Sequence, residues 1–99
     1  MDFTIKNYIS QHAKVFESMD LTAVQKCLDL VTKTIKDNKK IITCGNGGSA
    51  STASHYITDW NKMYNLATGE KFRGLSLVDN VGLITAYGND ISYDDVFSG

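Results

Sequence analysis

A glycine-rich segment near the middle of the chain has the residue types of an anion-binding loop. Gly45-Asn46-Gly47-Gly48-Ser49 follows a short apolar run and leads into a segment with helical spacing. Glycines let backbone N–H groups approach a ligand because no Cβ stands in the way, and a helix N-terminus adds unpaired donors and partial positive charge. Asn46 and Ser49 add side-chain groups suited to sugar hydroxyls or phosphate oxygens. The segment therefore predicts a phosphate-and-sugar loop, with a tight turn that merely needs glycine as the alternative.

Two familiar nucleotide-binding loops are excluded by the residues present. The chain has no G-x-x-x-x-G-K-[ST] pattern. It has no G-x-G-x-x-G pattern either, because the glycines at 45, 47 and 48 are followed by Ala50 and Ser51.

Two further polar pairs could contribute to a site beside this loop. His55 and Asp59 are four residues apart on the helix expected after the loop, so they share a face. Such a pair can hold a metal ion, relay a proton or simply interact at the surface. Asn89 and Asp90 lie after the next expected strand and helix, at the same sheet edge, although both residues also suit a turn that ends a helix.

The elements that would position these residues follow an alternating pattern. Apolar, partly β-branched runs at 41–44 and 74–78 predict strands, the first buried on both faces as in parallel sheets. Helical spacing extends from Ala50 to about Tyr64 and again from Val81 to about Tyr87, with a loop at 65–73. Strand, helix, strand, helix indicates an α/β fold with right-handed crossovers, and such sheets bind ligands at the carboxyl ends of their strands.

The N-terminal part, residues 1–38, predicts two long antiparallel helices. One apolar stripe follows residues 5–19, and a second helix begins after Asp20 or Thr22 and ends at Asp37-Asn38. The stripes are wide enough to pack on each other and on the sheet domain or a partner subunit. The residues expected to be buried there are Ile9, Phe16, Val24, Leu28 and Val31.

Residues 39–99 form the second part of the chain. Near its end this part has a turn at Gly88-Asn89-Asp90. A capping-box pattern, Ser92-x-x-Asp95, then predicts the start of another helix, which runs to the last residue given. Two parallel strands rarely form a stable sheet alone. We therefore expect residues 1–99 to be an incomplete domain whose C-terminal half is absent. The alternative is a small domain that completes its sheet by oligomerising.

Bulk composition fits an ordinary globular chain and argues against several classes of protein. Of the 99 residues 42% are hydrophobic, and the net charge of -1 offers no basic excess for binding nucleic acid. The longest apolar run is far below the roughly 18 residues of a membrane span. The first residues lack the pattern of a signal peptide. We expect a cytoplasmic protein, with Cys27 and Cys44 as buried thiols.

Three stretches together resemble the sugar isomerase (SIS) domain family, and within it most closely the phosphoheptose isomerases, also called sedoheptulose 7-phosphate isomerases. They are Cys44-Gly45-Asn46-Gly47-Gly48-Ser49-Ala50-Ser51 continuing to Ala53-Ser54-His55-Tyr56, then Ala86-Tyr87-Gly88-Asn89-Asp90, then Tyr93-Asp94-Asp95-Val96-Phe97-Ser98. The resemblance covers essentially the whole chain, including the leading pair of helices.

This resemblance implies a flavodoxin-like parallel sheet in a homotetramer that interconverts aldose and ketose phosphates through an enediol. It implies that His55 and Asp59 are ligands of a zinc ion and that Asp59 is also the catalytic base. The substrate-binding residues that follow are Asn46, Gly47, Gly48, Ser49, Asn89 and Asp90.

Two departures from the family pattern qualify that expectation. Asp59 stands where the active enzymes have glutamate, and the shorter side chain moves the carboxylate by about 1 Å, a displacement that can cost on the order of 10²-fold in rate. The family's serine-rich phosphate loop and a catalytic histidine lie beyond residue 99. We expect the full-length protein to be a phosphoheptose isomerase supplying heptose for lipopolysaccharide or capsule, and residues 1–99 alone to be inactive. The alternative is a non-catalytic SIS protein that binds or senses sugar phosphates, such as a replication-initiator-associating protein.

Overall fold

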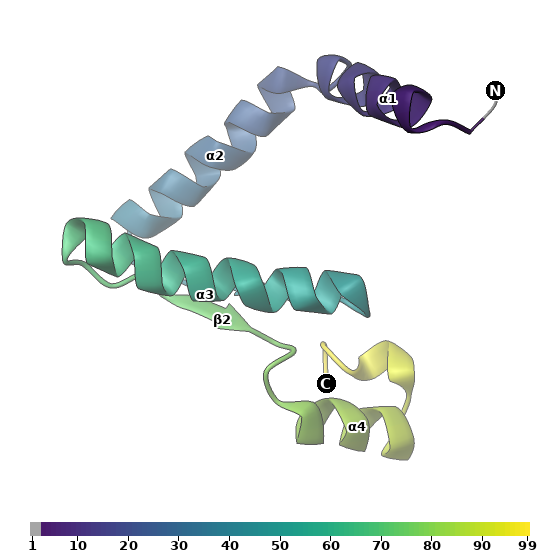
Figure 1. Ribbon diagram of the computed structural model, residues 1–99. Coiled ribbons are helices and arrows are strands. Elements are labelled where there is room, and N and C mark those ends of the chain that lie inside the picture. The colour runs from purple at the N-terminus through teal and green to yellow at the C-terminus, as the bar shows by residue number, and fades with distance from the viewer. Residues whose placement is uncertain (1–2) are drawn as a thin grey trace. The chain divides into compact units, whose positions relative to one another are not determined.

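The computed structural model describes residues 3–99, which form two compact units, one ending at Leu30 and the other spanning 31–99 (Figure 1). Helices α1 (Ile5–Glu17) and α2 (Leu21–Lys36) come first in the chain. The boundary between the units falls within α2. The α/β class is confirmed, since a parallel sheet with its helices follows in the second unit.

The two N-terminal helices begin at side-chain caps. The Asn7 N–H donates to Thr4 Oγ1 at 3.1 Å, and the Ala23 N–H donates to Asp20 Oδ1 at 3.1 Å, so Asp20 is the cap of α2. Helix α2 ends where Asn38 takes a left-handed conformation with φ of 53° and the Lys39 N–H returns to the Thr34 carbonyl at 3.0 Å. Local capping therefore sets both helices, as the sequence predicts.

The predicted burial of these helices is not seen in the single chain. Neither helix contains a buried residue: Ile9, Phe16, Val24 and Leu28 are exposed, and Val31 is only half-buried. Helices α1 and α2 do not pack on each other in the single chain, so the predicted antiparallel pair is not seen. Their coverage by the sheet domain or a partner subunit stays a prediction.

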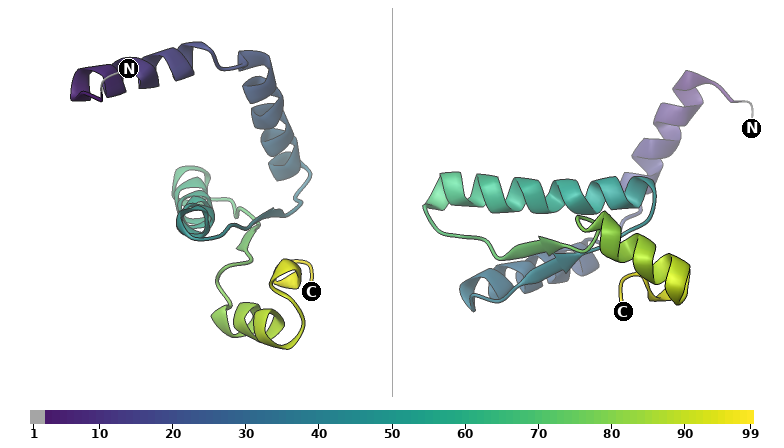
Figure 2. Two further views of the ribbon diagram at one scale, coloured as in Figure 1. Left: turned by 90° about the vertical axis from the view of Figure 1, so that its right-hand side faces the viewer. Right: turned by 90° about the horizontal axis from the view of Figure 1, so that it is seen from below.

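The second unit is built on two adjacent parallel strands, β1 (Ile41–Thr43) and β2 (Gly74–Ser76). Between them runs α3 (Gly48–Thr68), which lies along the sheet (Figure 2). Ile41 pairs with Gly74 and Thr43 with Ser76, which confirms the predicted parallel pairing. After β2 come α4 (Val81–Asp90) and a short 3-10 helix, η1 (Tyr93–Asp95).

Helix α3 covers one face of this sheet. Ala53 and Ile57 are its buried residues, and Thr43 Oγ1 donates to the Ala53 carbonyl at 2.9 Å. The register partners Ile42 and Leu75 are 55% and 49% exposed. Because residues alternate between the faces of a strand, the face away from α3 is open, and the prediction that the first strand is buried on both faces was wrong.

A side-chain amide fastens the start of β2 to α3. The Gly74 N–H donates to Asn61 Oδ1 at 3.1 Å, and Asn61 Nδ2 donates back to the Gly74 carbonyl at 3.2 Å. Beside this pair the ring of the buried Phe72 lies 5.3 Å from that of Trp60 and 5.9 Å from that of Tyr64, centroid to centroid. These contacts fix the segment that leads into β2 against α3.

Several predicted details of the polar segments were wrong. Helix α3 continues to Thr68, four residues past Tyr64, and ends at Gly69 with φ of 74°. Residues 88–90 form the last turn of α4 instead of a separate turn, because the α4 hydrogen bonds continue to Ile91 N–H on the Tyr87 carbonyl at 3.0 Å. Ser92 caps only the single turn of η1.

The cysteines also differ from expectation. Cys27 and Cys44 are both free and both exposed, so the prediction of buried thiols was wrong. Cys27 lies on α2, where no residue is buried, and Cys44 follows the last residue of β1 at the sheet edge. Within residues 3–99, no helix is long and apolar enough to cross a membrane.

The Asn61–Gly74 contact predicts a matched pair of glycine variants. A Cβ on Gly74 would stand 2.9 Å from both Asn61 Oδ1 and Ile57 Cδ1, whereas one on Gly82 would meet nothing closer than 3.5 Å. Gly74→Ala should lower the free energy of unfolding by about 1–3 kcal/mol, as overpacking does. Gly82→Ala, in the first turn of α4, should be neutral or stabilising. Urea unfolding measures both, and equal stabilities would contradict the packing described.

Candidate functional site

The glycine-rich loop is shaped by two glycines with separate reasons. A Cβ on Gly45 would lie 2.6 Å from the Ser49 carbonyl oxygen, so no other residue fits between β1 and the first turn of α3. Gly47 has φ of 57° and ψ of -124°, which side chains with a Cβ rarely adopt. The chain can therefore leave the strand and begin α3 at Gly48 without an intervening segment.

The loop's backbone donors divide into used and unused groups. The Ser49 N–H donates to the Asn46 carbonyl at 3.0 Å, and the Ala50 N–H donates to the Gly47 carbonyl at 3.1 Å. No hydrogen bond to the N–H of Gly47 or Gly48 is found among residues 3–99, and both glycines are exposed. Unpaired N–H groups at a helix N-terminus attract anions, so these two groups are the donors that a ligand can use.

An open groove runs from the end of β1 beside the first turns of α3. Its lining consists of Ile42, Thr43, Cys44, Ser49, Thr52, Ala53 and Tyr56. Ser49 thus uses its N–H inside the turn and presents its side chain to the groove. The groove is where sheets of this class hold ligands, at the carboxyl end of a strand.

His55 and Asp59 share one face of α3, as their spacing predicts. His55 Nε2 lies 3.4 Å from Asp59 Oδ1, and the two side chains are 74% and 59% exposed. With Thr52 and Tyr56 they line a shallow hollow, and because those two residues also line the groove, the hollow and the groove adjoin. An exposed pair of this kind contributes little to stability, so nothing in the fold requires it.

The pair has metal-ligand chemistry but is short of a complete site. An imidazole nitrogen and a carboxylate oxygen are both zinc ligands, and catalytic zinc takes three from the protein. No group of three histidine, cysteine, aspartate or glutamate residues close enough to hold a metal occurs within the part of the chain described. His55 and Asp59 fit two of the three positions.

Asn89 and Asp90 are exposed in the last turn of α4, where Asn89 Nδ2 donates to Asp90 Oδ1 at 2.9 Å. Their contribution to a substrate site stays a prediction.

One residue at the loop was not singled out from the sequence. The Tyr93 hydroxyl donates to Asn46 Oδ1 at 2.5 Å, joining η1 to the loop across 47 residues. A second link, from Ser54 Oγ to Asp79 Oδ1 at 3.2 Å, joins α3 to the segment after β2. Tyr93 lies in one of the stretches that carry the family resemblance, but its spacing from Asn46 gives no sign of a contact.

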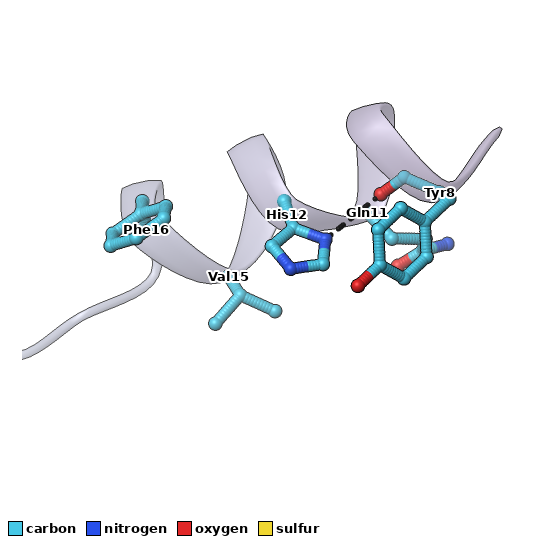
Figure 3. A pocket seen from close by; sticks show the side chains of 5 residues that line it. All are labelled: Tyr8, Gln11, His12, Val15 and Phe16. Carbon is cyan, nitrogen blue, oxygen red and sulfur yellow. Dashed lines mark hydrogen bonds between the residues drawn. The ribbon is translucent and has the colours of Figure 1, made fainter. Parts of the chain in front are cut away.

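A separate hollow lies on the first unit, on the apolar side of α1. It is lined by Tyr8, Gln11, His12, Val15 and Phe16 (Figure 3). The His12 ring lies 4.4 Å from the Tyr8 ring, with His12 Nδ1 3.1 Å from the Tyr8 carbonyl oxygen. Side chains from three successive turns thus form one exposed apolar strip.

Comparison with known proteins finds several relatives of one kind. No family model matches the chain. Over 96 residues it is 35% identical to a phosphoheptose isomerase of Campylobacter concisus, covering 95% of this chain and 50% of that protein. It is 34% identical over 96 residues to that of Aliarcobacter butzleri, covering 94% and 50%, and 32% identical over 102 residues to that of Helicobacter pylori, covering 99% and 52%.

A βα unit with a GNGGS loop, followed by a second parallel βα unit, defines the start of a sugar isomerase (SIS) fold. The chain belongs to the phosphoheptose isomerase family. It spans about half the length of the curated relatives it matches.

The loop geometry predicts opposite behaviour for two neighbouring glycines. Gly45→Ala should destabilise the second unit by about 1–3 kcal/mol, because the new methyl group meets the Ser49 backbone. Gly48→Ala should keep its stability, since a Cβ there has nothing within 4 Å. The same methyl group would enter the space of a ligand on the Gly47 and Gly48 N–H groups, so sugar-phosphate binding should weaken.

Thermal unfolding together with sugar-phosphate titration of the full-length protein separates the two effects. Unchanged binding in a stable Gly48→Ala variant would place the ligand elsewhere.

Proposed function

We propose that the full-length protein is an aldose–ketose isomerase that converts sedoheptulose 7-phosphate into a heptose 7-phosphate. The observation that carries the proposal is the similarity to phosphoheptose isomerases over nearly the whole chain. The exposed N–H groups of Gly47 and Gly48 support it, because they suit a phosphate or sugar oxygen.

In such a reaction a base takes a proton from the carbon next to the carbonyl, and an enediol forms. The proton returns to the former carbonyl carbon while another moves between the two oxygens, so that ketose becomes aldose with no net gain or loss of atoms. Asp59 is our candidate for the base, since an exposed carboxylate in the hollow that adjoins the groove can accept a proton. Asn46, Gly47, Gly48 and Ser49 would hold the sugar, with Asn89 and Asp90 at the same sheet edge.

The cofactor of this proposal is zinc, on the ground of ligand chemistry. His55 and Asp59 would hold it, and the third ligand would have to come from outside the described residues or from another subunit. A bound zinc ion would polarise the sugar carbonyl and so make the neighbouring carbon more acidic.

The reaction would take place in the cytoplasm and would provide heptose for lipopolysaccharide or capsule. A non-catalytic sugar-phosphate-binding protein is the alternative, favoured by Asp59, where the family resemblance implies a glutamate in the active enzymes. Both the isomerase and the non-catalytic protein would bind sugar phosphate, but only the isomerase would convert it.

Substitution of the candidate base, Asp59, tests the proposed isomerase activity. Asp59→Glu in the full-length protein should raise turnover of sedoheptulose 7-phosphate, by up to about 10²-fold, because it restores the reach of the carboxylate. Asp59→Asn, of equal size and without charge, should abolish turnover. Both variants should fold normally, since Asp59 is exposed and, within residues 3–99, makes only the weak contact with His55.

Turnover is measured with and without added zinc. A sharp fall in Asp59→Glu would mean that the shorter side chain is matched to its own substrate. Absence of turnover in all three proteins, with sugar phosphate still bound, would favour the non-catalytic alternative.

We also propose that the protein is a homo-oligomer, a tetramer by family resemblance, assembled through α1 and α2. The apolar residues of these helices are exposed, including Phe16 at 67%, which is costly unless another surface covers them. The strip of Tyr8, His12, Val15 and Phe16 would lie at the centre of the contact (Figure 3). An interface of this kind should bury at least roughly 1,000 Å².

A charge placed on that strip should prevent assembly. Phe16→Glu should shift the protein towards monomer in sedimentation velocity at micromolar concentration, because the interface would bury an unpaired carboxylate. Ser10→Glu, on the polar side of α1 by helical spacing, is the matched control and should leave assembly unchanged. A wild-type protein that sediments as a monomer would contradict the proposal.

A further inference from the structure

The contact between Tyr93 and Asn46 joins the two βα units at the loop. The distance of 2.5 Å between Tyr93 Oη and Asn46 Oδ1 is at the short end for hydrogen bonds. Asn46 belongs to the loop between β1 and α3, and Tyr93 begins η1 after α4. Within residues 3–99, no other side-chain hydrogen bond reaches the loop from the C-terminal part of the second unit.

Tyr93 is held in place by its own element. The Asp94 N–H donates to Ser92 Oγ at 3.1 Å, which starts η1, and the neighbouring Val96 is buried at 7% exposure. A Cβ on Gly88 of α4 would lie 3.7 Å from Val96 and 3.8 Å from the Tyr93 ring, so η1 packs closely on α4. The ring is thus anchored at its base while its hydroxyl reaches the loop.

The contact places the oxygen of the Asn46 amide on the Tyr93 hydroxyl. A carboxamide has one oxygen acceptor and one NH₂ donor, and either could face a tyrosine hydroxyl. O–H···O bonds are typically 2.7–2.8 Å and N–H···O bonds about 2.9–3.0 Å. A separation of 2.5 Å therefore fits a hydroxyl that donates to the amide oxygen. Within the described residues, Asn46 Nδ2 has no acceptor.

We propose that Tyr93 is a positioning residue that makes the loop a set of donors. With Oδ1 held by Tyr93, Asn46 keeps its donor Nδ2 free, in the same loop as the unused N–H groups of Gly47 and Gly48. Such a set selects ligand oxygens that accept hydrogen bonds, those of a phosphate or of a sugar carbonyl. The inference rests on the proposed function and names how its loop selects the substrate.

Loss of the hydroxyl should therefore act on binding through Asn46. In Tyr93→Phe the amide can turn its oxygen towards the ligand, and the binding of sugar phosphate should weaken about 3- to 10-fold, the range of one net hydrogen bond. Tyr87→Phe is the matched control, since it removes a hydroxyl of the same βα unit that has no hydrogen bond within residues 3–99. It should leave binding unchanged.

A double-mutant cycle in the full-length protein separates positioning from general support of the fold. Dissociation constants for sedoheptulose 7-phosphate are measured for wild type, Tyr93→Phe, Asn46→Ala and the double variant. We expect the Tyr93→Phe effect to vanish in the Asn46→Ala background, because the amide it orients is then absent. In the ligand-free protein, the Asn46 side-chain NH₂ resonances should shift in Tyr93→Phe and stay in place in Tyr87→Phe.

The outcomes are distinct. An equal loss of affinity in both backgrounds, or no loss in either, would overturn the positioning role while leaving the proposed function intact. Unshifted Asn46 resonances would overturn it as well. A wild-type protein that does not bind sugar phosphate would instead overturn the proposed function, and the inference with it.

Discussion

The absence of a side chain at residue 45 is the constraint on which the second unit depends. Because Gly45 passes within contact distance of the Ser49 backbone, α3 can turn back directly from β1 and lie along the sheet. That path places Ala53 and Ile57 over the strands, brings Asn61 to Gly74, and leaves the N–H groups of Gly47 and Gly48 at the helix start. The tight turn at Gly45 thus determines both the packing of α3 on the sheet and the exposure of the loop N–H groups.

The second βα unit completes what the first begins. Parallel pairing puts the carboxyl ends of β1 and β2 at one edge, so residues from far along the chain can reach the loop. Asp79 contacts Ser54 of α3, and Tyr93 contacts Asn46. The first link holds the helix, whereas the second sets the hydrogen-bonding character of the loop. A site of this type therefore depends on both βα units of residues 31–99 together.

The sequence predicts the parts of this structure that depend on local patterns. Helix periodicity and the Asp20 cap identify the first two helices, and the short apolar runs followed by glycine identify the parallel strands and the loop. Each of these follows from residues close together in the chain. His55 and Asp59 are likewise placed correctly because helical spacing alone determines their shared face.

The features that were mispredicted or missed depend on distant contacts or on what covers a surface. Gly88-Asn89-Asp90 has turn-forming residues, yet it continues α4, with Gly88 facing the Tyr93 and Val96 side chains. The contact of Tyr93 with Asn46 spans 47 residues and has no local signature. Burial of Ile42 and Cys44 was expected from their apolar character, but no second layer packs on that side within residues 3–99.

The open sheet face has a consequence for the solubility of residues 3–99 on their own. Ile42 and Leu75 stand side by side on it, paired in register and uncovered by α3. Exposed β-structure with aliphatic side chains is what molecular chaperones retain and what stacks into aggregates when chaperones are saturated. A further layer of structure that covers Ile42 and Leu75 would therefore remove a surface on which copies of the chain can stack.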